Sequence, residues 1–504
     1  MLIPVPASEP ELAPENTAIV LLRIAADRES PTDMDDFIAL TNTAVAYLQH
    51  TKFQQALIAQ GALDIPLAVL VDSYTRFDSH PSIGPSSPDE DDAKILSQMR
   101  SNLNQVLSDV SALPEFKDAV PVVSAFSSSL RRWLSSPQLQ LQVCACIMLG
   151  NLARSDATCE EFVHTSKVHI PLIAVLTNAN DSQLLHAALG FLKNLALPLK
   201  NKEALGEAGI FDALPRLWLL DTFQQIQFSS ISLARQLINN TFENVRKICK
   251  RLTDDKDSPA NMRSKLSLLI ALFERTDVEP IKMEIARLIT AVCRVFNSQP
   301  FESPEKMVAI RRNFFQMHPD VGRPLGFMVS QTKWPVVRSE GWFVFALMAR
   351  FEEGAQCISD MMQDVAVFQP LVEMLTGQNL VDYKPIASPS SEASGSTPGS
   401  RALSGTTLEG QTPESAKPHA QAEEMARIDR ENALVLISEL LKNRGSEMAV
   451  MRRALFEDLL QGGGEIVLSY REAKWGDTLV PKEKRARGNF QMGEVIQQAN
   501  FELS

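Results

Sequence analysis

The chain has few aromatic residues, which make up 7% of the sequence and include only four tyrosines. This composition fits short-range packing of helices better than the core of a β-rich enzyme. The sequence lacks any run of 18 apolar residues, so we expect no membrane-spanning helix. Its first residues, MLIPVPASEPELAPEN, have no basic n-region and several prolines, and we expect no signal peptide.

The residue patterns that build most catalytic and metal sites are also missing. The six cysteines form no CxxC pair, the seven histidines form no HExxH motif, and no GxSxG occurs. The triplet Gly462-Gly463-Gly464 is not followed by Lys-Ser or Lys-Thr, so it is interpreted as a turn between helices and not as a phosphate loop. We therefore expect no catalytic residue, no metal, no cofactor, and buried reduced thiols typical of a cytosolic protein.

The sequence does contain an internal repeat. Residues 141–176 align with residues 184–218 at an offset of 43, which places GNLA (150–153) over KNLA (193–196). Apolar residues in each copy recur at steps of three and four, the period of an amphipathic helix. A helical repeat of about 40–47 residues is typical of armadillo and HEAT solenoids. We predict an all-α, armadillo-repeat, right-handed superhelical solenoid, a scaffold whose concave face binds partners.

Signals for helix ends agree with this repeat. Asp181 and Ser182 are expected to cap a helix that runs to about Leu197, and Pro198 to end it. Gly209 is expected to adopt left-handed backbone at the junction of two helices. Similar helical patterns occur on both sides, and roughly seven to nine repeats are expected.

Composition divides the chain further. The segment 385–427 is rich in Ser, Pro, Gly and Thr and has too little apolar surface to offset its ordering entropy, so we expect it to be disordered. The predicted order is a flexible N-terminus (1–15), divergent N-terminal repeats (16–135) with an acidic loop (78–93), armadillo repeats (136–380), the Ser/Pro-rich insertion (385–427), a last armadillo repeat (428–470) and a C-terminal tail (471–504).

The formal net charge of −12 argues against a nucleic-acid partner and favours a basic one. A short basic run at 482–487 is interpreted as a solvated tail, with a nuclear signal as the alternative. We expect a cytoplasmic monomer, with nuclear shuttling left open.

The amino-acid sequence of the repeats resembles that of one protein family. HAALGFLKNLALPLKNKEALGEAGI (186–210), followed by QIQFSSISLARQLINNTFENV (225–245), is similar to two consecutive repeats of the small-GTPase GDP-dissociation stimulators, the smg GDS family of armadillo proteins. GNLARSDATCEEFV (150–163), SEGWFVFALMARFE (339–352) and NALVLISELL (432–441) resemble further segments of that family in the same order. The resemblance covers roughly residues 140–460 and is most specific over 145–245.

This resemblance implies an atypical guanine-nucleotide exchange factor for Rho- and Rap-type GTPases. Members hold GTPases that end in a polybasic stretch with a prenylatable cysteine, promote GDP release and chaperone the GTPase towards membranes. The acidic chain suits such a basic partner. Exchange of this kind is binding without chemical catalysis, so we do not expect an enzyme in the chemical sense.

The third helix of each armadillo repeat lines the concave groove. The repeat alignment places one amide per repeat in this groove, which could clamp an extended peptide or could tie adjacent repeats together. The predicted partner-binding residues are Met148, Asn151, Arg154, Phe191, Asn194, Leu233, Gln236, Trp342 and Glu439.

Two other functions remain open. A karyopherin-like peptide adaptor would need a ladder of Trp and Asn three residues apart, but the Trp positions hold Met148, Phe191 and Leu233. An armadillo co-chaperone that opens the nucleotide cleft of a heat-shock ATPase would have no exchange activity on small GTPases.

Overall fold

The computed structural model of the chain describes residues 12–78, 90–298, 304–383 and 416–476. The chain divides into two compact units, Met1–Gln331 and Thr332–Ser504. Among the described residues no strand forms, and an isolated bridge joins Arg251 and Ser264. The predicted all-α fold is therefore confirmed.

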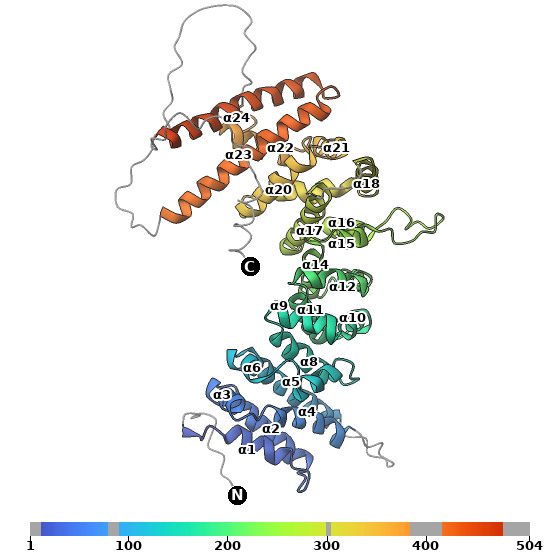
Figure 1. The fold of residues 1–504 in the computed structure, drawn as a ribbon, viewed down its shortest axis with the longest axis vertical. Coiled ribbons are helices and arrows are strands. Elements are labelled where there is room, and N and C mark those ends of the chain that lie inside the picture. The colour runs from blue at the N-terminus through green and yellow to red at the C-terminus, as the bar shows by residue number, and fades with distance from the viewer. Residues whose placement is uncertain (1–11, 79–89, 299–303, 384–415, 477–504) are drawn as a thin grey trace, which may run out of the picture. The chain divides into compact units, whose positions relative to one another are not determined.

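The first unit is a succession of helices that follow the chain from α1 to α19 (Figure 1). Its helices are α1 (Thr17–Ala25), α2 (Met34–Leu48), α3 (Thr51–Ala59), α4 (Asp64–Phe77), α5 (Glu90–Ala112), α6 (Pro114–Ala119), α7 (Ala125–Trp133), α8 (Leu139–Leu152), α9 (Asp156–Glu160) with the π-helix η2 (Glu161–Thr165), α10 (His169–Asn178), α11 (Ser182–Leu195), α12 (Leu199–Glu207), α13 (Ile210–Leu217), α14 (Gln224–Ile238), α15 (Phe242–Cys249), α16 (Lys265–Arg275), α17 (Glu279–Ser298), α18 (Pro304–Met317), the 3-10 turn η3 (Pro319–Val321) and α19 (Gly322–Val329).

These helices form repeated groups of three. The groups α3–α5, α6–α8, α9–α11, α12–α14 and α15–α17 succeed one another, and the third helix of each packs against the third helix of the next. Thus α5 lies on α8, α8 on α11, α11 on α14, and α14 on α17. The 43-residue offset seen in the sequence is the spacing of stacked armadillo-type repeats.

Helices α8 and α11 approach each other closely at a glycine. A Cβ at Gly150 would lie 3.4 Å from the Cβ of Phe191, at van der Waals contact, so the two helices leave room there for little more than a methyl group. The Phe191 ring in turn meets Phe162 edge-on, with ring centroids 5.8 Å apart. Leu149 and Leu192, which the repeat alignment superimposes, are both buried in the core.

The expected helix signals are present. The Asp181 carboxylate accepts a hydrogen bond of 2.8 Å from the backbone N–H of Leu184, which caps α11. Gly209 has a φ of +88° between α12 and α13, a conformation that glycine adopts without steric cost. Pro198 follows α11 and occupies the N-cap of α12.

The second unit contains α20 (Pro335–Met348), α21 (Glu352–Met361), α22 (Val365–Thr376), α23 (Ala416–Arg444) and α24 (Val450–Gly476). Helix α23 packs against α20, α21, α22 and α24. The Asn443 side chain donates a 2.8 Å hydrogen bond to the carbonyl of Ala349, which ties the end of α23 to the end of α20.

The glycine triplet 462–464 lies inside α24, so its interpretation as a turn is wrong. A Cβ at Gly463 would lie 2.9 Å from Leu434 Cδ2 and 3.0 Å from Leu375 Cδ2. The missing side chain lets α24 approach α22 and α23 closely. Packing has overridden the low helix propensity of glycine.

Several predicted boundaries need correction. Helix α5 begins at Glu90 and α23 at Ala416, so the end of the predicted acidic loop (78–93) and of the predicted insertion (385–427) are helical. Helix α24 continues to Gly476, beyond the predicted end of the last repeat at residue 470. The predictions for most of 1–15, for 385–415 and for 477–504 lie outside the described residues.

In the described part of the chain, no single helix is long and apolar enough to cross a membrane. The pair α3 and α4, bent by 99°, passes that test only when both helices are taken together. Phe53 and Leu57 of α3, and Leu67 and Leu70 of α4, are buried in the helix stack.

Candidate partner-binding surface

The three predicted groove amides form hydrogen bonds to the preceding repeat. Asn194 Nδ2 donates to the carbonyl of Gly150 at 2.9 Å, and Gln236 Nε2 donates to the carbonyl of Lys193 at 3.0 Å. Asn151 Nδ2 donates to Ser111 Oγ at 2.8 Å. Each bond joins neighbouring third helices, because donor and acceptor are 44, 43 and 40 residues apart. In the structure these amides therefore tie adjacent repeats together, and we call each of these hydrogen bonds a tie. Contact of the amides with a partner stays a prediction.

Four other predicted groove residues belong to the core. Met148, Leu233 and Trp342 are fully buried, and Phe191 is 1% exposed. The expectation that these side chains line a groove is wrong, because the third helices have neighbours on more than one side. The apolar stripe that the repeat places one turn before each amide fills the space between helices. In the second unit, the Trp342 ring packs edge-on against Phe345 at 5.9 Å.

Three residues after each of these amides in the sequence lies an exposed residue, and together these residues form a row that we call the exposed row. Arg154, Leu197 and Asn239 occupy this position in successive repeats, and all three are exposed. Leu197 is 62% exposed, although it is a large apolar residue. The sequence prediction included Arg154 but missed Leu197 and Asn239. All three follow the ends of α8, α11 and α14, and the repeat alignment would have found them as the position three residues after each amide.

Charged side chains flank this row. Arg154 Nη2 donates to Asn151 Oδ1 at 2.7 Å, so its guanidinium lies beside the tie. Arg235 Nε donates to the buried Glu284 at 2.7 Å and links α14 to α17. In the second unit, which is described by itself, the predicted groove residue Glu439 of α23 is half-buried and pairs with Lys442 at 3.3 Å. We define the tie surface as Asn151, Asn194 and Gln236 together with the exposed row Arg154, Leu197 and Asn239.

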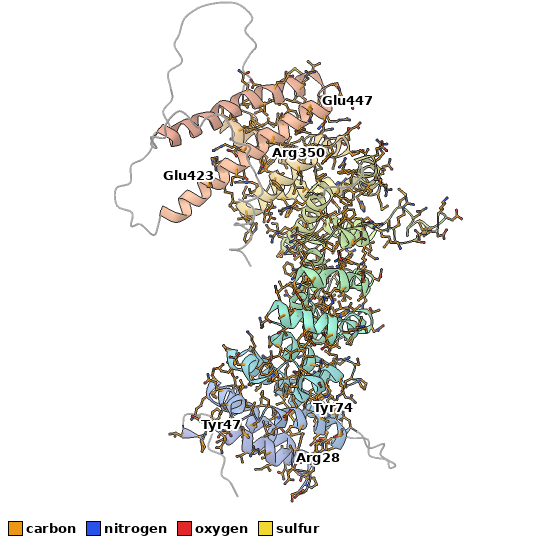
Figure 2. All side chains as sticks on the ribbon, viewed as in Figure 1. Arg28, Tyr47, Tyr74, Arg350, Glu423 and Glu447 are labelled. Carbon is orange, nitrogen blue, oxygen red and sulfur yellow. The ribbon has the colours of Figure 1, made fainter. Side chains whose placement is uncertain are left out.

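A second polar cluster, at the N-terminal end of the first unit, is structural. The Arg100 guanidinium lies 3.8 Å from the centroid of the Tyr74 ring, which is labelled in Figure 2. Arg100 also donates to Ser73 Oγ at 2.9 Å and to Asp78 at 2.9 Å. Burial raises the pKa of Tyr74. The buried arginine is surrounded by acceptors, so this cluster joins α4 to α5 and leaves little for a ligand.

The cysteines and histidines of the described residues form no reactive cluster. No group of three or more potential metal ligands occurs there. Four of the six cysteines are buried. Burial raises the pKa of Cys159 to about 11 and that of Cys146 to about 12, so both stay protonated thiols at neutral pH.

Comparison with known proteins identifies relatives of part of the chain. It is 31% identical over 120 residues to Rap1 GTPase-GDP dissociation stimulator 1-A of Xenopus laevis, covering 23% of this chain and 20% of the relative. It is 34% identical over 122 residues to the GTPase-GDP dissociation stimulator vimar of Drosophila melanogaster, covering 21% and 19%. The chain is a distant, partial homologue of these stimulators.

The homology has clear limits. The stimulator 1-B of Xenopus laevis is 27% identical over 164 residues, which cover 32% of this chain and 25% of the relative. The chain thus spans a quarter or less of the length of these curated relatives. No family model matches the chain.

Solved structures resemble the chain more loosely. An engineered protein shares 16% identity with a TM-score of 0.49, over 92% of this chain and 94% of its own. A designed armadillo repeat protein in complex with the peptide (KR)4 shares 15% identity with a TM-score of 0.41, over 62% of this chain and 100% of its own.

Proposed function

We propose that this chain binds small GTPases of the Rho and Rap type and promotes the release of their GDP. The observation that carries the proposal is its distant homology to the GTPase-GDP dissociation stimulators. The stack of armadillo-type repeats supports it, because a solenoid offers a long surface to a folded partner.

The proposed mechanism is a shift of populations. A scaffold accelerates GDP release when it binds the nucleotide-poor form of the GTPase more tightly than the GDP-bound form. The size of the effect is limited by the ratio of these two affinities. The net charge of −12 would favour encounter with a GTPase that carries a basic tail.

Within this proposal the tie surface contacts the GTPase. Leu197 is the residue of that surface best suited to anchor a partner, because an exposed leucine gains most when a partner covers it. The tie amides hold the surrounding helices in place, and Arg154 adds a charge one repeat earlier in the stack.

The test is capture of a Rap- or Rho-type GTPase stripped of its nucleotide, together with release of fluorescent GDP. Leu197→Asp should weaken capture by about tenfold, the loss of one good interface anchor. Leu219→Asp is the matched control, because Leu219 is 64% exposed in the turn before α14 and lies outside the tie surface. Equal capture by both variants would place the contact elsewhere.

A parallel assay separates the alternatives. If the chain captures neither GTPase but binds a nucleotide-free heat-shock ATPase, the co-chaperone alternative replaces the proposal. Binding of an isolated basic peptide without any change in GDP release would favour the peptide adaptor.

A further inference from the structure

First helices of successive repeats in the first unit do not all pack against each other, and α15 with α18 is one of the pairs that do not. In the preceding repeats α12 packs along α15. Helices α15 and α18 hold the same places in the next pair of repeats, but they make at most marginal contact. The result is a half-open hollow of about 690 Å³, lined by α15, by the start of the following loop, and by Phe296 of α17 and the C-terminal half of α18.

The floor of this hollow is aromatic. Phe242 and Phe296 meet edge-on with ring centroids 6.1 Å apart, and Phe296 lies 4.8 Å from Phe314. Ile310 and Met317 extend the apolar surface along α18. Phe296 and Phe314 are each 5% exposed, so the rings are held in place by the core behind them. A rigid apolar floor can receive a side chain without reorganising.

One wall of the hollow is fixed by a neutral histidine. His318 Nδ1 lies 2.8 Å from the carbonyl of Phe314, which can only accept, so this nitrogen carries the proton. The Ser264 hydroxyl then donates to Nε2 at 2.7 Å. Ser264 also caps α16 and pairs with Arg251 across the loop. The loop that borders the hollow is thus anchored at both ends.

The rim of the hollow is basic. It carries four basic side chains, Arg246, Lys247, Lys250 and Arg251, and two acidic ones, Glu243 and Asp254. Arg246 pairs with Glu243 at 3.2 Å, but both are well exposed, and such pairs are exchanged easily. Within the described residues Lys247 and Lys250 form no ion pair. A chain with a net charge of −12 therefore presents two cations without an ion-pair partner, the exposed Lys250 and the half-buried Lys247, along one side of an apolar floor.

We propose that this hollow binds an acidic peptide segment of a partner protein, with an apolar side chain of the segment on the aromatic floor. The cations of the rim match the carboxylates of such a segment, and the floor matches its apolar side chain. The site is independent of the tie surface and of GTPase binding, because it lies between first helices and not along the third helices.

The experiment uses the full chain and a fluorescein-labelled peptide of glutamates around a central Leu-Phe pair, followed by fluorescence anisotropy. The double variant Lys247→Glu with Lys250→Glu should bind about tenfold or more weakly, since two attractions become repulsions. The control is Lys117→Glu with Lys256→Glu, which makes the same change in net charge at exposed positions outside the hollow. This control should bind like the unaltered chain.

Two further arms decide the chemistry. Ile310→Ser should weaken binding several-fold, and a peptide with lysines in place of the glutamates should not bind. Unchanged binding by Ile310→Ser would mean that the rim holds simple anions, and it would overturn the proposal. Equal binding by the lysine peptide, or by the rim double variant, would overturn it as well. Circular dichroism verifies that each variant is folded, and no GTPase is present, so the outcome does not depend on the proposed exchange activity.

Discussion

The Asn244 side chain occupies the space that a side chain on Gly206 would need. A Cβ at Gly206 would lie 1.9 Å from Asn244 Oδ1 and 2.9 Å from its Cγ. Asn244 cannot move aside freely, because its Nδ2 donates to the carbonyls of Lys202 at 2.8 Å and of Leu237 at 2.9 Å. The glycine of one repeat and the asparagine of the next therefore form a single packing unit between α12 and α15.

Gly206→Ala should destabilise the first unit by about 2–3 kcal/mol, because the added methyl group displaces Asn244 and breaks its two buried hydrogen bonds. Gly190→Ala is the matched control, since it is exposed in α11 and a Cβ there would meet nothing within 4 Å. Its better helix propensity should stabilise the protein by about 0.5–1 kcal/mol. Urea unfolding followed by circular dichroism should move the two midpoints in opposite directions, and equal shifts would contradict this packing unit.

The ties between repeats make a second prediction. Asn151→Ala combined with Asn194→Ala removes the donors for Ser111 Oγ and for the Gly150 carbonyl. We expect a loss of about 1 kcal/mol for each tie, measured as a lower midpoint of thermal or urea unfolding. Asn178→Ala, at an exposed position in α10, should leave the midpoint nearly unchanged. If the double variant kept full stability but lost GTPase capture, the amides would be contact residues and not ties.

Stability should fall in mild acid because of His318. Burial lowers the pKa of His318 to about 4, while its hydrogen bond to the Phe314 carbonyl acts in the opposite direction. An unfolded histidine has a pKa of about 6.5. The folded state therefore favours the neutral ring, and its contribution is complete above about pH 6.5 and is lost as the pH falls towards 4.

The loss is on the order of 3–3.5 kcal/mol, the free energy that corresponds to pKa values of about 6.5 in the unfolded and about 4 in the folded state. His318→Gln should flatten the dependence of the unfolding midpoint on pH between 4 and 6.5, although its stability at pH 7 is lower. His164→Gln, at an exposed position, should follow the unaltered protein. An unchanged pH profile in the His318 variant would assign the acid sensitivity to other groups.

Capture of a GTPase with a basic tail should depend on salt. The acidic chain and the basic tail attract each other over a Debye length of about 10 Å at 0.1 M salt, which shrinks to about 3 Å at 1 M. Binding measured by anisotropy should weaken across this range and should lose its salt dependence when the basic tail is deleted. A flat affinity with the intact tail would exclude electrostatic recruitment.

The sequence by itself determined the repeat and the ends of its helices. The offset between residues 141–176 and 184–218 is visible by comparing the sequence with itself, and the cap at Asp181 and the left-handed backbone at Gly209 follow from local residue types. Periodicity also identified which positions on α8 and α11 are equivalent. Helix caps and periodicity depend on residues within about one helical turn, so they can be predicted without knowing what packs against each helix.

Only the tertiary structure decided which of the equivalent positions reach solvent. From the repeat alignment alone, Met148 and Phe191 could not be distinguished from groove residues, but neighbouring helices cover both side chains. Leu197 is exposed because no neighbouring helix covers it. The hollow lies where α15 and α18 are not packed against each other, an arrangement that no pattern in either helix predicts. Exposure and cavities are set by packing between repeats, and the sequence of one repeat encodes only its own share of that interface.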